Sequence, residues 1–191
     1  MHLLDDPIKL RKPSKIISSY YYKLLDKNTD PSGFQTISKG FEFSSGHSPG
    51  KKKMDRRTRD KKKEIDNYHN QIQTKVYSVL TEMYGKRNVG TENHLGNQER
   101  VDVIVQKKKG FTFYEIKTSS TAKAAIREAL GQIMAYAFWP DKNIADKLVI
   151  VSTIKPKRET RIYMERLRNE FKLPIYYQHF DDEKGVLMEE I

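Results

Sequence analysis

The chain has 191 residues, enough for one ordinary domain and an extension, and its 36 basic and 25 acidic side chains give a net charge of +11. This positive charge favours a polyanionic partner. The absence of cysteine excludes disulfides, thiolate zinc sites, cysteine-ligated iron–sulfur clusters and cysteine nucleophiles. With no secretory leader pattern and no run of about 18 apolar residues, we expect a soluble, cytoplasmic protein with no membrane partner.

The first 60 residues differ in composition from the rest. Residues 14–27 are compatible with a short helix, and residues 29–50 are rich in Gly, Ser and Pro. In the basic arm, residues 51–63, nine basic residues accompany two acidic ones, a pattern typical either of a solvated linker or of a segment that contacts phosphates. We assign residues 1–60 to an extension for recognition or assembly and 61–191 to the main domain. Six residues of the extension are candidate nucleic-acid contacts: Lys51, Lys52, Lys53, Arg56, Arg57 and Arg59.

From Glu64 onward the apolar residues are periodic. Positions three and four residues apart predict a helix that ends at Gly85, with a stripe formed by Ile65, Tyr68, Ile72, Val76, Val79 and Met83. Strands are predicted at 88–94, 100–106 and 110–117, the last two joined by a four-residue loop. A helix at 122–138, a strand at 146–154, an amphipathic helix at 159–171 and a final strand at 174–180 follow. This order predicts an α/β domain with a mixed central sheet flanked by helices.

Two charged residues, Glu115 and Lys117, stand in the otherwise apolar strand predicted at 110–117. The predicted hairpin register places Asp102 opposite Glu115, where Cβ atoms are about 5 Å apart and two carboxylates repel each other unless a cation lies between them. Lys117 projects from the same face as Glu115. An exposed cross-strand pair at a sheet edge is the structural alternative. Because unpaired charges in a central strand cost several kcal/mol, we favour a functional cluster.

The pattern of Asp102, twelve intervening residues, Glu115–Lys117, and then Gln132 and Tyr136 one helical turn apart resembles the PD-(D/E)XK nuclease superfamily with its restriction-endonuclease-like fold. The Gln132 and Tyr136 pair is similar to that of nuclease domains in bacterial recombination helicase-nucleases. The resemblance covers about residues 64–154. It implies an α-β-β-β-α-β core, here with an added helix and strand.

The resemblance also implies metal-dependent hydrolysis of a phosphodiester bond, leaving a 5′-phosphate and a 3′-hydroxyl. Asp102, Glu115 and the main-chain carbonyl of Ile116 would bind Mg²⁺, for which Mn²⁺ can substitute. Lys117 would hold or deprotonate the attacking water or stabilise the transition state. The glutamine and tyrosine of the following helix would steer Lys117 or a DNA phosphate.

The sequence departs from the superfamily pattern at two points. Val101 stands where the name of the motif expects proline, and many members carry a metal-binding glutamate on the first helix whose counterpart here is open. The candidates for that role are Glu64, Gln71, Gln73, Glu82 and, on the strand before Asp102, Glu92. The five histidines show no metal-ligand spacing, so we expect structural or surface roles for them, with His69 beside the inward face of the first helix.

These observations predict a Mg²⁺-dependent DNA endonuclease of restriction or phage defence. Since cutting a duplex needs two sites, we expect a homodimer or a larger assembly, with a partner ATPase or a recognition subunit as candidate components. A basic hairpin tip near the predicted site offers further phosphate contacts: Lys107, Lys108 and Lys109. The alternatives are a junction or repair nuclease and a catalytically inactive nucleic-acid-binding module of the same fold. The residues leave open the target sequence, base modification and the choice between DNA and RNA.

Overall fold

The computed structural model describes residues 41, 43–48, 59–95, 99–108, 110–139 and 142–191, and the side chains from residue 66 onward within the first helix. The helix predicted at 14–27 lies outside the described residues. So do six of the candidate nucleic-acid contacts: Lys51, Lys52, Lys53, Arg56, Arg57 and Lys109.

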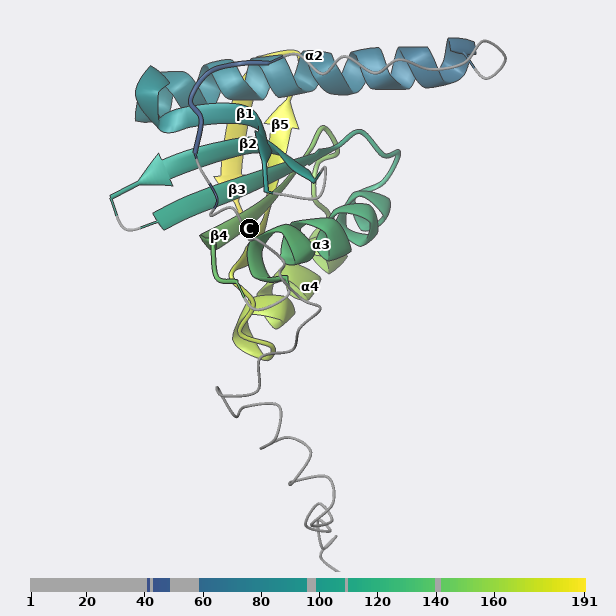
Figure 1. Ribbon diagram of the computed structural model, residues 1–191. Helices are drawn as coiled ribbons and strands as arrows, with labels where there is room; N and C mark the ends of the chain where they lie inside the picture. The colour runs from purple at the N-terminus through teal and green to yellow at the C-terminus, as the bar shows by residue number, and fades with distance from the viewer. Residues whose placement is uncertain (1–40, 42, 49–58, 96–98, 109, 140–141) are drawn as a thin grey trace, which may run out of the picture. The chain divides into compact units, whose positions relative to one another are not determined.

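A single mixed sheet of six strands forms the centre of the described unit, so the predicted α/β class with a mixed sheet is confirmed (Figure 1). The strands lie in chain order: β1 (Val89–His94), β2 (Arg100–Lys107), β3 (Gly110–Lys117), β4 (Ala145–Ser152), β5 (Ile175–Asp181) and β6 (Val186–Glu190). The β3–β4 and β4–β5 pairs are parallel, and the other pairs are antiparallel. β3 is therefore a central strand, as its apolar residues predict.

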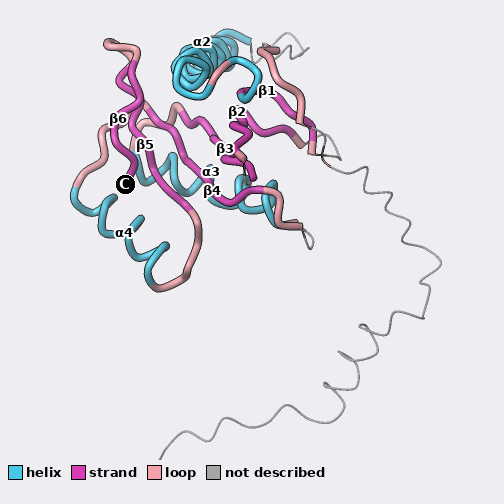
Figure 2. The backbone as a smooth tube through the Cα atoms, turned by 90° about the vertical axis from the view of Figure 1, so that its left-hand side faces the viewer, coloured by secondary structure: helices cyan, strands magenta, loops and turns pink. Residues whose placement is uncertain are grey.

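Helices cover both faces of the sheet. Figure 2 shows α2 (Arg59–Tyr84) on one side and α3 (Ala122–Phe138) and α4 (Arg158–Asn169) on the other. The alternation of β3 explains how one strand serves both layers: Tyr114 belongs to the core under α2, and Phe113 belongs to the core under α3. The site residues of β3 thus lie between two packed layers.

The apolar stripe of α2 differs in part from the prediction. Ile72 and Val76 are fully buried, and Leu80 is buried with them, whereas Tyr68 and Met83 are exposed. The face that packs on the sheet is therefore rotated slightly from the predicted stripe at the helix ends. The helix ends at Gly85 as predicted, with a positive φ of 87° there. Its first turns begin earlier than expected, at Arg59.

The remaining elements agree with the prediction except at the C-terminus. β3 and α3 have the predicted bounds, and the Thr121 hydroxyl caps α3 by accepting the Ala124 N–H at 3.1 Å. β6 was not predicted, because its five residues include two adjacent glutamates and no clear alternation. It pairs antiparallel with β5. No helix in the described ranges is long and apolar enough to span a membrane.

The predicted register of the β2–β3 hairpin is confirmed, with Gln106 opposite Phe111. The turn is tighter than predicted, because Lys107 also pairs with Gly110. Toward the other end of the hairpin, the ladder stops at Val103 and Tyr114. The next opposed positions are those of Asp102 and Glu115, so the two strands separate at the predicted site.

Part of the predicted extension packs on the sheet. We call residues 41 and 43–48 the N-terminal segment. Gly46 forms a parallel bridge with Gly90 of β1, and Phe41 contacts Phe111 of β3 edge to face with ring centroids 5.1 Å apart. A Cβ on Gly90 would lie 2.1 Å from the Ser44 carbonyl oxygen, so only glycine allows this approach. The folded unit therefore includes residues that the predicted boundary at 60/61 assigns to the extension.

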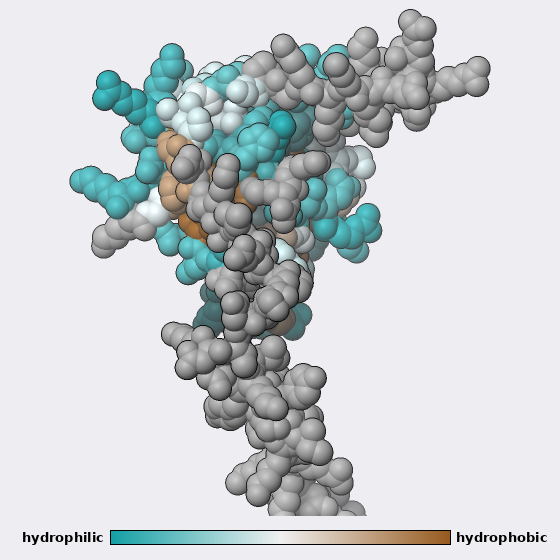
Figure 3. Space-filling view, in the orientation of Figure 1, coloured by the Kyte–Doolittle hydropathy of each residue, from teal (hydrophilic) through white to brown (hydrophobic). Residues whose placement is uncertain are grey.

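The described surface reflects the charged composition. The face in Figure 3 is hydrophilic along its margins, with an apolar area on its left side. Large exposed apolar side chains are spread over several elements rather than gathered on one, and include Trp139 after α3, Ile162 of α4 and Met188 of β6.

Candidate active site

Asp102 lies where β2 leaves β3. The two strands form no main-chain pair at this position. Instead, the Asp102 carboxylate binds a main-chain N–H of β3: its Oδ2 accepts the Ile116 N–H at 2.8 Å. This bond fixes the carboxylate next to the peptide unit that links Glu115 and Ile116. The predicted meeting of two acidic residues from neighbouring strands therefore occurs at a gap in the sheet ladder.

Glu115 and Lys117 form a buried ion pair on β3. Lys117 Nζ donates to Glu115 Oε1 at 2.7 Å, and the side chains are 17% and 4% exposed. Burial, reinforced by the negative charge of Asp102, raises the pKa of Glu115 to about 8, although Lys117 opposes the shift. The second oxygen, Oε2, is buried and has no hydrogen-bond partner among the described residues. An unpaired carboxylate oxygen is thus held beside a second carboxylate and an amine.

From α2, Gln73 and His69 reach the same point. Gln73 is fully buried, and its Nε2 donates to the Asp102 carbonyl at 3.0 Å and to Glu92 Oε1 at 2.8 Å. His69 Nε2 lies 3.4 Å from Asp102 Oδ1. Burial lowers the pKa of His69, but the hydrogen bond to Asp102 and its charge outweigh this effect, so the pKa is raised. The ring of His69 therefore faces the acidic cluster from α2.

Tyr136 of α3 faces the site from the other layer. Burial, followed by the charges of Glu115, Asp102, Glu99 and Glu92, raises the pKa of this half-buried tyrosine to about 12. Its hydroxyl is therefore a proton donor rather than an anion throughout the neutral range. Gln132, one turn earlier on α3, is exposed and makes no hydrogen bond to the other described side chains.

The structure also gives the positions of three residues that were candidates for the remaining metal-binding role. Gln71 and Glu82 are exposed on α2, so the inward-facing amide is Gln73, and Glu92 of β1 turns toward that amide. Arg100 lies 3.5 Å from Glu92 on its other side. The side chain of Glu64 lies outside the described part of α2.

The basic hairpin tip is not near the site, and that prediction is wrong. Lys107 and Lys108 are exposed at the opposite end of β2 from Asp102, and five strand residues span about 17 Å. Lys107 lies over the Tyr84 ring, 5.1 Å from its centroid, at the end of α2. Arg59 is the first residue of α2. The prediction placed this tip near the acidic residues, whereas Asp102 lies at the other end of β2.

The chemistry of the donor set fits a hard divalent cation in part. Asp102, Glu115 and the Ile116 carbonyl offer oxygen atoms, and the unpartnered Oε2 of Glu115 is available to a ligand. Within the described ranges, no three Asp, Glu or His side chains are close enough together to hold a metal ion by themselves. Any such ion would therefore depend on main-chain oxygen, water or substrate for its remaining ligands.

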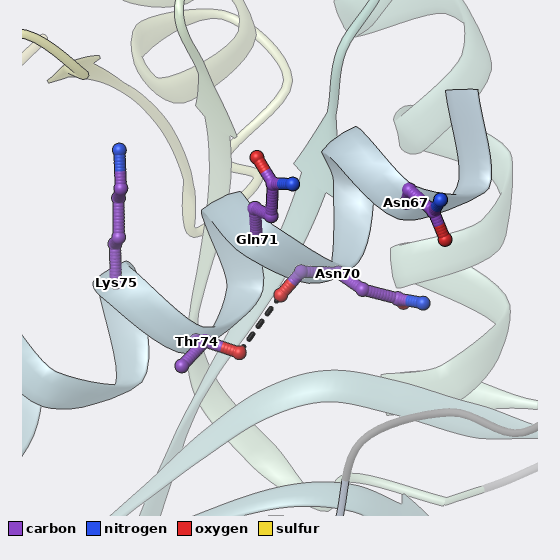
Figure 4. Close-up of a pocket in the computed structure, with 5 residues that line it drawn as sticks. All are labelled: Asn67, Asn70, Gln71, Thr74 and Lys75. Carbon is purple, nitrogen blue, oxygen red and sulfur yellow. Dashed lines mark hydrogen bonds between the residues drawn. The ribbon is translucent and has the colours of Figure 1, made fainter. Parts of the chain in front are cut away.

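A pocket on α2 is lined by five polar residues (Figure 4): Asn67, Asn70, Gln71, Thr74 and Lys75. The only hydrogen bond drawn there joins the Thr74 hydroxyl to the Asn70 carbonyl, which is internal to the helix. The acidic cluster is on the sheet side of α2.

Comparison with protein-family models, with curated proteins and with solved structures gives no match to this chain. The geometry of the site is therefore the basis on which function has to be argued.

Proposed function

We propose that this protein is a metal-dependent nuclease of restriction-endonuclease-like fold that hydrolyses DNA phosphodiester bonds. The observation that carries the proposal is Glu115, a buried carboxyl group with one unpartnered oxygen, beside Asp102 and hydrogen-bonded to Lys117. Keeping such a group buried and close to a like charge destabilises the fold, and arrangements of this kind are characteristic of functional sites. Helices on both faces of the mixed sheet are compatible with the proposed fold.

Asp102, Glu115 and the main-chain carbonyl of Ile116 would hold Mg²⁺, with Mn²⁺ as a substitute. When bound, the ion would lower the pKa of a water ligand and neutralise charge on the phosphate. To serve as a ligand, Glu115 would have to lose the proton that its raised pKa favours at neutral pH. Lys117 would supply a positive charge for the attacking water or a phosphate oxygen.

Residues from the two helices complete the proposed site. His69 Nε2, at 3.4 Å from Asp102, is placed to donate to this carboxylate and to orient it. Tyr136 remains protonated at neutral pH, so its hydroxyl can donate to a phosphate oxygen. Gln132 is exposed at the surface beside them, where it can contact DNA rather than take part in bond making.

The net charge of +11 supports a polyanionic substrate. Because hydrolysis of both strands requires two such sites, we propose a homodimer or a larger assembly, acting in restriction or phage defence. A partner ATPase or recognition subunit belongs to the same proposal. A junction or repair nuclease would use the same site, and comparing branched with linear DNA substrates distinguishes the two functions.

Incubation of supercoiled plasmid with and without Mg²⁺ tests the proposal. We expect nicking that requires the metal and that Asp102→Asn and Lys117→Met each abolish, while gel-shift binding of DNA is retained. Matched controls are Glu189→Gln and Lys155→Met, which alter exposed residues of the same charge and should leave nicking unchanged. Undiminished nicking by both site variants would rule the assignment out. DNA binding without nicking by the wild-type protein would favour the inactive module of the same fold.

A further inference from the structure

Glu92 has a backbone conformation that a strand residue rarely adopts. Its φ is +53°, in the left-handed region, although it lies inside β1. Among the described residues other than glycine, only Lys172 shares a positive φ, and that residue lies in the connection between α4 and β5. Such conformations cost free energy and persist where the surroundings over-determine them, most often at functional sites.

The N-terminal segment holds the two neighbours of Glu92. The Thr91 N–H donates to the Gly46 carbonyl at 3.0 Å, and the Ser48 N–H donates to the Thr91 hydroxyl at 2.9 Å. On the other side, the Ser44 N–H donates to the side-chain oxygen of Asn93 at 2.7 Å. Thr91 and Asn93 are both buried. The segment therefore anchors the residues on either side of Glu92, through the N–H and hydroxyl of Thr91 and the side chain of Asn93.

The strained conformation directs the Glu92 carboxylate toward the site. Thr91 and Asn93 remain paired with β2, opposite Val103 and Val101, while Glu92 between them leaves the ladder. Its Oε1 accepts from Gln73 Nε2 at 2.8 Å, and the same Nε2 donates to the Asp102 carbonyl at 3.0 Å. The Nη1 atom of Arg100 lies 3.5 Å from Glu92 Oε2, so its positive charge partly offsets that of the carboxylate.

We propose that Glu92 and Gln73 are positioning residues for Asp102, and that the N-terminal segment is the brace that keeps Glu92 in place. The inference rests on the proposed nuclease function for its catalytic consequence. Its structural part is independent of that function: a chain of contacts runs from the segment through Glu92 and Gln73 to the main chain of Asp102. Gln73 lacks a partner for its own Oε1 among the described residues, so its amide is oriented by the two acceptors alone.

Glu92→Gly separates positioning from folding. Glycine accepts a positive φ without strain, so the variant should unfold at the same temperature as the wild type or higher, while it loses the carboxylate. We expect Mg²⁺-dependent nicking to fall by about 10- to 100-fold, with a higher Mg²⁺ concentration at half-maximal rate. Glu92→Gln, which keeps an acceptor for Gln73, should restore most of the rate. The matched control is Lys172→Gly, which relieves the other positive φ and should leave nicking unchanged.

Hydrogen exchange of the Ile116 amide gives a readout that needs no activity. This N–H donates to Asp102 Oδ2, so it should exchange faster in Glu92→Gly than in Lys172→Gly if Glu92 positions Asp102. Equal exchange in the two variants, or nicking by Glu92→Gly at the wild-type rate and Mg²⁺ dependence, would overturn the inference. A fall in unfolding temperature that accounts for the lost activity would also overturn it. If the wild-type protein does not nick DNA, the nuclease proposal fails, and the exchange comparison still decides the positioning role.

Discussion

Replacing Glu115 by glutamine should stabilise the metal-free protein at neutral pH, by an amount that grows as pH rises. Burial and the charge of Asp102 raise the pKa of Glu115 from 4.5 to about 8. The folded state thus keeps a proton that the unfolded chain releases. The stability that this group contributes is full below pH 4.5 and is lost as pH rises through the folded pKa.

The size of the effect follows from the pH range between the ordinary pKa of Glu115, 4.5, and its pKa in the folded protein, about 8. Each pH unit inside it costs the folded state up to about 1.4 kcal/mol, so between about pH 5 and pH 7 the wild-type protein should lose about 3 kcal/mol through Glu115. Glutamine has no proton to lose and still offers Lys117 an acceptor. The variant should therefore match the wild type within about 1 kcal/mol near pH 5 and exceed it by about 3 kcal/mol near pH 7.

Urea unfolding in the presence of a chelator, at several pH values, measures this difference. Glu189→Gln changes an exposed glutamate of β6 and should follow the wild-type curve throughout. Parallel stability curves for the wild type and Glu115→Gln would refute the reasoning, because they would mean that Glu115 ionises in the folded protein as it does in the unfolded chain.

Three further changes have defined outcomes. Gly90→Ala places a Cβ 2.1 Å from a main-chain oxygen of the N-terminal segment and should cost about 1–3 kcal/mol in urea unfolding, whereas Gly131→Ala, with open space around it inside α3, should stabilise by about 0.5–1 kcal/mol. Ile133→Ala removes a fully buried side chain between α3 and the sheet and should cost about 2–5 kcal/mol, against less than about 0.5 kcal/mol for the exposed Trp139→Ala. His69→Gln should lower the unfolding temperature more at about pH 5.5 than at about pH 8.5, because a raised histidine pKa stabilises the fold below the ordinary value of 6.5 and ceases to do so as pH rises through the folded value. A pH-independent loss would contradict the contact with the acidic cluster.

The elements with strong local signals could be predicted from the sequence. The helix at 122–138 has a hydroxyl cap before it and Trp139–Pro140 after it, and the strand at 110–117 follows a glycine in a short hairpin, so both have the predicted bounds. The hairpin register followed from the loop alone and placed Asp102 and Glu115 at the positions just beyond the last observed pair, Val103 and Tyr114. β6 lacks such signals, because its pairing with β5 depends on a tight turn and on contacts across the sheet.

The site could be predicted only where its residues lie on one hairpin. Glu115 and Lys117 share a face because strand residues alternate, and this needs no tertiary information. His69 and Gln73 are four residues apart and so share a helix face, but their contact with Asp102 depends on where β2 leaves β3. The left-handed φ of Glu92 has no sequence signal, because the bonds that hold its neighbours Thr91 and Asn93 reach residues more than forty positions away.

The N-terminal segment also determines how the sheet can associate with other chains. By bonding to Val89 and Thr91, Gly46 occupies the outer edge of β1, so strand addition by another molecule is blocked there. The opposite edge belongs to β6, a short strand that ends in two charged residues, Glu189 and Glu190, a feature that discourages edge-to-edge pairing. Within the part of the chain that the structure describes, both borders of the sheet therefore disfavour a continuous intermolecular sheet.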